Sequence, residues 1–220
     1  YARIDGWAVG IVANQRKVVK SKMGEMQFGG VIYSDSADKA TRFIANCNQK
    51  NIPLVFLQDV TGFMVGSRSE HGGIIKDGAK LVNAVSNSVV PKFTIIIGGS
   101  YGAGNYAMCG KAYDPRLIVG WPSAQVAVMG GEQASKVMLQ IEMAALKGKG
   151  ETITPEKETE LLNRIRSKYE ETISPYYAAS RLWLDAVIDP LETRTWISLG
   201  IEAASQSPAT REFNMGVLQT

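Results

Sequence analysis

The sequence predicts an α/β protein with a mostly parallel sheet flanked by helices. One reason is that a short apolar strand pattern, a glycine-rich turn and a helical pattern follow one another three times along the chain. Another is that strand patterns such as residues 93–97 are continuous β-branched runs, typical of strands buried on both faces. A third is size, because 220 residues with 45% hydrophobic content can bury a full core. We therefore expect one domain over residues 1–220.

Strand and helix patterns alternate up to residue 146. The first two strand patterns flank Asn14-Gln15 and predict a hairpin, and Ser36 or Asp38 can cap the first helix. Residues 59–73, rich in glycine and serine, predict a loop, and Gly98 and Gly99 break the fourth strand. The expected order is strands 7–13 and 16–20, helix 36–48, strand 52–58, helix 74–85, strand 93–97, a short helix 105–110, strands 117–121 and 125–129, and helix 130–146.

The C-terminal part is predicted to be helical, apart from Val187-Ile188. It follows a polar hinge at residues 147–158, and its helices begin at prolines, which suit the first helical position. These helices are residues 155–169, 175–184 and 190–205. We therefore expect a core at residues 1–146 and a helical appendage at residues 155–220.

Charge and cysteine content exclude several partners. The 24 basic and 21 acidic residues are interspersed, so nothing predicts a nucleic-acid partner. No apolar run approaches the roughly 20 residues that cross a bilayer, so no membrane partner is expected. Cys47 and Cys109 have neither metal-ligand nor disulfide spacing, and no signal-peptide pattern opens the chain. We expect a cytoplasmic protein, and the start at Tyr1 suggests a longer polypeptide.

Three glycine-rich turns follow predicted strands and are candidate binding loops. Open α/β sheets bind ligands at the carboxyl ends of their strands, and free N–H groups at a helix start attract negative charge. The alternative is that the glycines only make tight turns. The turns contain Thr61, Gly62, Phe63, Met64, Val65 and Gly66; then Gly102, Ala103 and Gly104; then Met129, Gly130 and Gly131.

Residues 98–102 also match the Gly-x-Ser-x-Gly turn of serine hydrolases, in a strand-to-helix context. Such a hydrolase needs its histidine after the serine, but the single histidine, His71, precedes Ser100. A serine hydrolase using Ser100 and a noncatalytic assembly module therefore remain as alternatives.

Other chemistries find little support. Residues 102–107 fit the loose dinucleotide pattern Gly-x-Gly-x-x-Ala, but no carboxylate follows the next strand, and both a Walker lysine and metal-ligand spacing are absent from the sequence. The chemistry that remains is that of a site with backbone dipoles and almost no general acid or base. Such a site suits the stabilisation of an enolate-like oxyanion.

Several segments resemble the C-terminal half of biotin-dependent acyl-CoA carboxyltransferases, and most of all the β subunit of methylcrotonoyl-CoA carboxylase. Two further segments carry the resemblance into the helical tail, so it covers essentially the whole chain. The segments are residues 56–66, 73–80, 99–110, 112–116 and 128–134, followed by residues 175–183 and 187–190.

The resemblance implies a crotonase-like fold, a spiral of β-β-α turns. It implies that carboxybiotin on a carrier domain loses CO₂, that the N–H groups of Ala103 and Gly104 hold the biotin enolate, and that CO₂ then adds to an acyl-CoA. The other residues of the three turns would help to bind biotin. Implied partners are a biotin carboxylase, a biotin carrier subunit and further copies in a hexamer, and implied locations are the cytoplasm or, in a eukaryote, the mitochondrial matrix.

In this family a second oxyanion, on the acyl group, is held by the N-terminal half of a partnering subunit. That half lies outside this sequence, so the resemblance implies that the piece is inactive alone. Residues 67–73 depart from the methylcrotonoyl pattern toward propionyl-type relatives, while Asn105-Tyr106 favour the methylcrotonoyl branch. The acyl chain stays open, and a sodium-pump decarboxylase relative is a further alternative.

Overall fold

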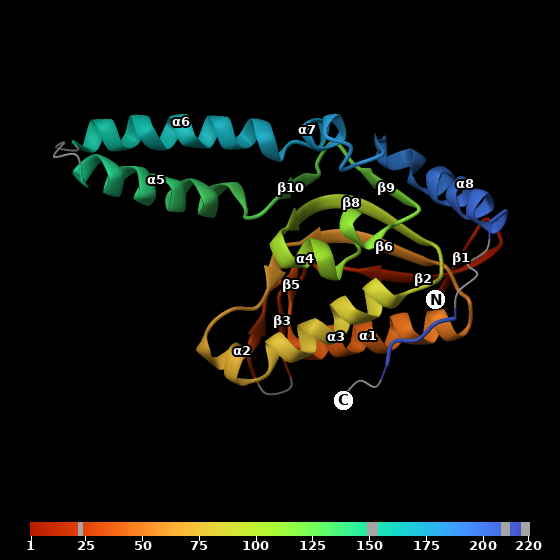
Figure 1. Ribbon diagram of the computed structural model, residues 1–220. Helices are drawn as coiled ribbons and strands as arrows, with labels where there is room; N and C mark the ends of the chain where they lie inside the picture. The colour runs from red at the N-terminus through yellow and green to blue at the C-terminus, as the bar shows by residue number, and fades with distance from the viewer. Residues whose placement is uncertain (22–23, 149–153, 208–211, 217–220) are drawn as a thin grey trace.

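A computed structural model describes residues 1–21, 24–148, 154–207 and 212–216, and its centre is a seven-stranded sheet (Figure 1). The strand order is β1-β2-β6-β8-β9-β11, with β10 paired to β8 as well. Strand β1 pairs with β2 antiparallel and the other pairs are parallel, which confirms the predicted α/β class. The strands are β1 Ala2–Ile4, β2 Trp7–Ala13, β6 Leu54–Val60, β8 Lys92–Tyr101, β9 Leu117–Gly120, β10 Gln125–Ala127 and β11 Ala186–Val187.

Strand β8 lies at the centre of this sheet and is longer than predicted. It pairs with β6 on one side, and on the other with β9 along Phe93–Ile96 and then with β10 along Gly99–Tyr101. The prediction that Gly98 and Gly99 end the strand was therefore wrong. A Cβ built on Gly98 would lie 2.3 Å from Asp59 Oδ1, so the glycine allows close packing within a strand that continues to Tyr101.

The predicted N-terminal hairpin was also wrong. Strand β2 pairs with β1 through a two-residue turn, and β3 (Val19–Lys20) pairs with β4 (Met26–Gln27) in a separate small sheet. Asp5 and Gly6 have φ values of 47° and 85°, the positive pair that a two-residue hairpin of type I′ requires. The Asp-Gly pair is the local signal that the prediction missed.

Helices cover both faces of the main sheet. Helices α1 (Ser34–Gln49) and α3 (Ile74–Asn87) lie side by side on one face with α4 (Gly102–Ala107) beside them, around buried residues such as Phe56 and Leu81 (Figure 1). Helix α8 (Thr193–Ser205) covers the other face through Ile197 and Ile201. The sheet is therefore buried on both faces, as its apolar strands predict.

The segment 59–73, predicted to be a loop, contains regular structure. Strand β7 (Gly62–Phe63) pairs in parallel with β5 (Val31–Ile32), and α2 (Ser67–His71) follows. A two-residue strand that begins with a positive-φ glycine leaves no periodic signal in the sequence. In chain order, β7 leads from β6 to α2, and in space it contacts α4.

Helices α5 (Gly131–Gly148) and α6 (Pro155–Ile173) pack against each other and extend away from the sheet (Figure 1). Half of the predicted hinge, residues 147–148 and 155–158, falls on these two helices, and residues 149–153 of it lie outside the described residues. Helix α7 (Pro175–Ser180) is shorter than predicted, β11 returns to the main sheet, and the 3₁₀ turns are Lys111–Tyr113 and Pro190–Glu192. The boundary between core and appendage stays a prediction, but β11 and α8 pack on the sheet itself.

Candidate active site

The chain passes from the end of β8 directly into the short helix α4. Tyr101 is the N-cap residue, and no side chain caps the start of this helix within the described residues. The N–H groups of Gly102, Ala103 and Gly104 are therefore the first of the helix, which have no acceptor inside it. The Ala103 side chain is exposed, whereas Gly104 is buried. The carboxyl end of the central strand thus presents backbone donors.

Two glycines in this turn are required by close packing. Gly102 has a φ of 49°, and a Cβ on it would lie 2.9 Å from the carbonyl oxygen of Val128. A Cβ on Gly104 would lie 2.6 Å from Val60 Cγ2 and 3.2 Å from Gly62 Cα. These contacts place α4 against Gly62 of the first predicted turn and against Val128, the residue directly before the third.

The turn at residues 61–66 lies beside α4, with part of its backbone engaged. The N–H of Thr61 donates to the Gly30 carbonyl (2.7 Å) and that of Met64 to the Ile32 carbonyl (2.8 Å). Phe63 packs against Gly78 of α3, at the edge of the core. The remaining members face open space. A Cβ added to Gly62 or Gly66 would have no atom within 4 Å, and the side chain of Val65 is exposed.

The turn at residues 129–131 begins α5 and is held by α6. The Tyr169 hydroxyl donates to the Met129 carbonyl (2.8 Å), and Gly130 faces open space. A Cβ added to Gly131 would lie 3.7 Å from the ring of Tyr169. The contact between Gly102 and the Val128 carbonyl joins this turn to α4.

Tyr101 is the last residue of β8 and the N-cap of α4, and sequence reasoning did not single it out. Its hydroxyl donates to Gln125 Oε1 on β10. Burial is the main cause that raises the pKa of Tyr101, and the nearby Tyr169 adds to the effect. The phenol is therefore neutral around pH 7 and acts as a hydrogen-bonding group.

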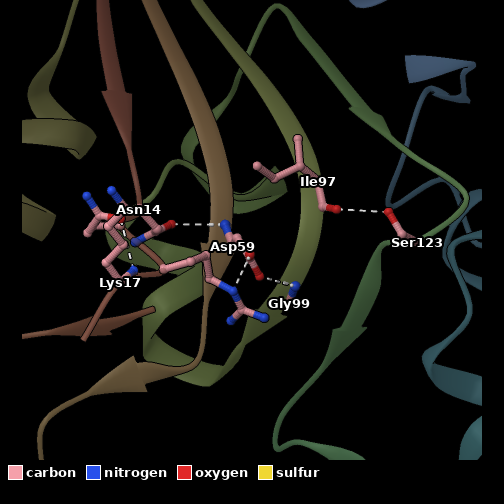
Figure 2. A network of polar contacts seen from close by, with 8 residues as sticks. Asn14, Lys17, Asp59, Ile97, Gly99 and Ser123 are labelled. Atoms are coloured by element: carbon pink, nitrogen blue, oxygen red, sulfur yellow. Dashed lines mark hydrogen bonds and ion pairs between the residues drawn. The ribbon is translucent and has the colours of Figure 1, made fainter. Parts of the chain in front are cut away.

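Asp59 locks the carboxyl ends of β2, β6 and β8 together. Figure 2 shows its backbone N–H donating to Asn14 Oδ1 (3.0 Å) and its Oδ1 accepting from the Gly99 N–H (2.9 Å). Arg16 Nε pairs with Asp59 Oδ2 at 2.9 Å. The register between β6 and β8 shifts just here, between Gln58 and Val60, so these bonds hold the strands together where the regular ladder is interrupted. Sequence reasoning placed Asp59 in a loop and missed this role.

Ser100 does not have the geometry of a nucleophile. Its side chain is fully buried, and its hydroxyl donates to Gln58 Oε1 (2.6 Å) while accepting from Asn105 Nδ2 (2.7 Å). His71 lies on α2, where its Nδ1 is 3.5 Å from the Ser67 hydroxyl. A substrate carbonyl cannot approach Oγ of a buried serine that is already bonded on both sides, so the geometry contradicts the serine hydrolase alternative.

Other reactive groups are few within the described residues. Burial raises the pKa of the Cys109 thiol to about 11, so it stays protonated and unreactive. The described residues contain no group of three or more His, Cys, Asp or Glu side chains that could hold a metal ion. No helix in the described part of the chain is long and apolar enough to cross a membrane.

A cavity of about 860 Å³ lies elsewhere, between β2, β5 and α1. Ile11, Phe28, Arg42 and Phe43 are among its lining residues, and none of the predicted site residues lines it. This cavity and the glycine turns are therefore different places. The arrangement at the turns offers backbone donors next to open space, which can stabilise charge on an oxygen.

Comparisons with known proteins agree on one family. A family described as "Carboxyl transferase domain" matches residues 1–215. The biotin-dependent 3-methylcrotonyl-coenzyme A carboxylase beta1 subunit of Mycobacterium tuberculosis is 46% identical over 208 residues, which cover 94% of this chain and 37% of that protein. The mitochondrial methylcrotonoyl-CoA carboxylase beta chain of Dictyostelium discoideum is 47% identical over 208 residues, covering 94% and 33%.

Solved structures show the same relationship. A transcarboxylase 12S crystal structure, described as a hexamer assembly with methylmalonyl-coenzyme A and methylmalonic acid bound, matches with a TM-score of 0.82 and 35% identity. The match covers 99% of this chain and 39% of that one. The chain thus spans less than two fifths of the length of each of these proteins.

Proposed function

The chain belongs to the carboxyl transferase domain family, and from this premise we propose that it forms the part of a biotin-dependent acyl-CoA carboxyltransferase that handles carboxybiotin. Family membership confirms the resemblance noted in the motifs, and the likeness to the 12S structure confirms the crotonase-like fold. The observation that carries the proposal is the start of α4 at the end of the central strand, where no side chain caps the first N–H groups and Ala103 is exposed.

The residues of the turn fit a ureido group. Biotin supplies, when bound, a ureido nitrogen that carries the carboxyl group and a ureido oxygen that gains negative charge when the group is lost. The N–H groups of Ala103 and Gly104 would donate to that oxygen, since preformed donors are most effective where charge develops. They are part of a helix fixed on a buried strand, so little rearrangement is needed. No side-chain acid or base is required of this chain for that task.

The neighbouring turns would form the walls of the site. A Cβ on Gly62, Gly66 or Gly130 would meet open space, and Tyr169 donates a hydrogen bond to the Met129 carbonyl next to Gly130. A flat bicyclic ring can lie against glycine backbone more closely than against any side chain. We therefore assign the remaining residues of the turns at 61–66 and 129–131, with Gly102, to shaping the biotin site.

Acyl-CoA is the proposed acceptor, since the relatives named above act on acyl-CoA compounds. The donors for the acyl oxyanion would come from the larger part of the protein, which the chain's relatives contain and this sequence does not. Biotin carboxylase and a biotin carrier subunit are the proposed partners, and the full protein would assemble as a hexamer, as the 12S neighbour is described to do. We propose the cytoplasm as its location, or the mitochondrial matrix in a eukaryote, as for the named relative.

The test is carboxyl transfer by the full-length protein. Radiolabelled bicarbonate, ATP, biotin carboxylase, biotinylated carrier and methylcrotonoyl-, propionyl- or geranyl-CoA are combined, and acid-stable label in the acyl-CoA is counted. The proposal expects label in at least one acyl-CoA that depends on the biotinylated carrier. Label that is unchanged with an unbiotinylated carrier, or no label with any of these acyl-CoA compounds, would overturn it.

A further inference from the structure

A chain of buried hydrogen bonds runs beneath α4. Asn105 Nδ2 donates to Ser100 Oγ (2.7 Å), the Ser100 hydroxyl donates to Gln58 Oε1 (2.6 Å), and Gln58 Nε2 donates to the Met108 carbonyl (2.7 Å). Gln58 and Ser100 are both fully buried. The chain starts at Asn105 inside α4, passes through β8 and β6, and ends at the C-cap residue Met108, so the helix is tied to the sheet at its middle and at its C-terminal end.

The chemistry of the groups fixes the direction of every bond. A backbone carbonyl can only accept, so the amide nitrogen of Gln58 must face Met108 and its oxygen must face Ser100. The Ser100 hydroxyl must then donate to Gln58, which leaves its lone pair to accept from the Asn105 amide nitrogen. Each hydroxyl and amide along the chain therefore has one orientation that satisfies its neighbours, and such a network specifies a single arrangement.

Helix α4 depends on such external ties. It has six residues, and helices of this length are unstable on their own. Packing alone leaves room for small rotations, because its turn contains glycines whose conformation is soft. A network anchored in two buried strands removes that freedom at the helix that carries the proposed donors.

We infer that Gln58, Ser100 and Asn105 are positioning residues, which aim the N–H groups of Ala103 and Gly104 at the oxygen of the bound biotin ring. This inference rests on the proposed function. It gives the Gly-x-Ser-x-Gly turn a structural role. Ser100 is the central residue of the hydrogen-bond chain that holds α4 in place, and it is not a nucleophile. Small displacements of catalytic groups lower rates strongly. Loss of one hydrogen bond of this chain should therefore lower kcat even in a variant that stays folded.

The experiment compares Ser100→Ala with a matched control in the full-length protein. Thr41→Val is the control, because Thr41 is also a buried hydroxyl that donates to a backbone carbonyl, Ala37 at 2.7 Å, but on the remote helix α1. Asn105→Ala is a second, milder variant, since its side chain is half-buried and it tests the same chain if Ser100→Ala fails to fold. Tm and biotin-dependent carboxyl transfer are measured for each.

The inference expects kcat to fall about 10- to 100-fold in Ser100→Ala and in Asn105→Ala, the scale of a small misplacement of catalytic groups. Ser100→Ala leaves two buried partners unsatisfied, so its Tm should fall at least as far as that of Thr41→Val. The kcat of Thr41→Val should stay near wild type, and KM for acyl-CoA should hardly change in any variant. A kcat for the folded Ser100→Ala or Asn105→Ala variant within about twofold of Thr41→Val overturns the inference alone. A wild-type protein without carrier-dependent transfer overturns the proposed function first and the inference with it.

Discussion

Lys80 is a charged side chain inside the fold, and its environment shows what one residue contributes. It reaches from α3 to Asp77 (2.9 Å) and to Asp38 on α1 (3.0 Å) with only 10% of its side chain exposed. Hydrogen bonds to Asp77 and then Asp38 raise the pKa of Lys80, and the hydrogen bond from Lys80 lowers the pKa of Asp77. Because the Asp77 pKa is depressed on folding, its contribution to stability is present above the ordinary carboxylate pKa and is lost as the pH falls through the folded value.

We predict that Lys80→Met lowers Tm near neutral pH, because it removes the cation that bridges the carboxylates of Asp77 and Asp38. The Tm difference from wild type should shrink when the pH is lowered from about 7 to about 3, where carboxylates become protonated. Thermal scans across this pH range measure it. Lys136→Met is the control, since Lys136 pairs with Glu132 on an exposed helix surface and should change Tm little. An equal Tm loss at both pH extremes would show that Lys80 acts by packing alone.

Single residues also mark where sequence reasoning stops. The pattern around Ser100 is the same in a nucleophile turn and in a strand end, and only its burial and its two hydrogen bonds separate the cases. Asp59 begins what looks like a polar loop, yet its carboxylate packs on Gly98 and joins two strands. Both roles depend on partners about 40 residues distant in sequence, which local patterns cannot reveal.

At the level of elements, the hairpin of β1 and β2 depends on its turn. Gly6 has a φ of 85° and nothing within 4 Å of a built Cβ, so any cost of a side chain there is conformational. We predict that Gly6→Ala lowers the free energy of unfolding by about 1–2 kcal/mol, the cost of a left-handed backbone for a residue with Cβ. Gly148→Ala also adds a methyl group in open space, but at the end of helix α5, and should cost nothing. Chemical denaturation of both variants decides this, and equal effects would contradict the turn assignment.

The α5 and α6 helices form a second unit with a small core of their own. Leu139, Leu161 and Ile165 are buried between them, and Arg164 pairs with Glu142. We predict that Leu161→Ala weakens this helix pair by about 2–3 kcal/mol through lost burial and the cavity left behind. Faster amide hydrogen exchange should appear in α5 and α6 but not in β6 or β8. Val137→Ala, at an exposed position of α5, should leave exchange unchanged, and protection lost throughout the sheet would contradict an independent unit.

Element types were largely predictable because the buried strands and amphipathic helices are long and periodic. The continuous apolar runs of β6 and β9 and the spacing in α1 and α3 gave each element close to its observed bounds. The failures are short or glycine-interrupted pieces, namely β7, the end of β8 and the pairing of β1. In each, tertiary packing of a glycine or a turn decides the structure, and periodicity says nothing about it.

At the level of the whole molecule, each turn could be predicted from the sequence, but the contacts between the turns could not. Glycine after an apolar strand indicated three candidate turns, whereas the 3.2 Å approach of Gly62 to the built Cβ of Gly104 depends on how β6, β7 and α4 pack. Part of the turn at residues 61–66 is engaged in the small sheet, and this also requires the three-dimensional partner. The roles proposed for these turns await experiment.

We predict that the 220-residue chain alone does not carboxylate acyl-CoA, because the acyl oxyanion needs donors that lie outside it. It should also self-associate, since Trp7, Tyr176 and Trp183 are exposed and would normally be partly covered. Trp121 and Trp196, by contrast, pack partly against the core. Radiolabel transfer with carrier and biotin carboxylase supplied, and sedimentation at micromolar concentration, are the assays. Transfer by the chain alone, or a strictly monomeric profile, would contradict this prediction.

The central claim is that backbone N–H groups of α4 stabilise charge on the biotin ring, and a proline at Ala103 tests it most directly. Proline removes one donor yet is tolerated in the first turn of a helix, and the Ala103 side chain faces solvent. Ala103→Gly keeps the N–H and serves as the control. In the full-length protein we expect Ala103→Pro to lower kcat of carrier-dependent carboxyl transfer about 10²- to 10³-fold, with Ala103→Gly near wild type. A folded Ala103→Pro variant that transfers carboxyl groups as fast as Ala103→Gly would contradict the claim.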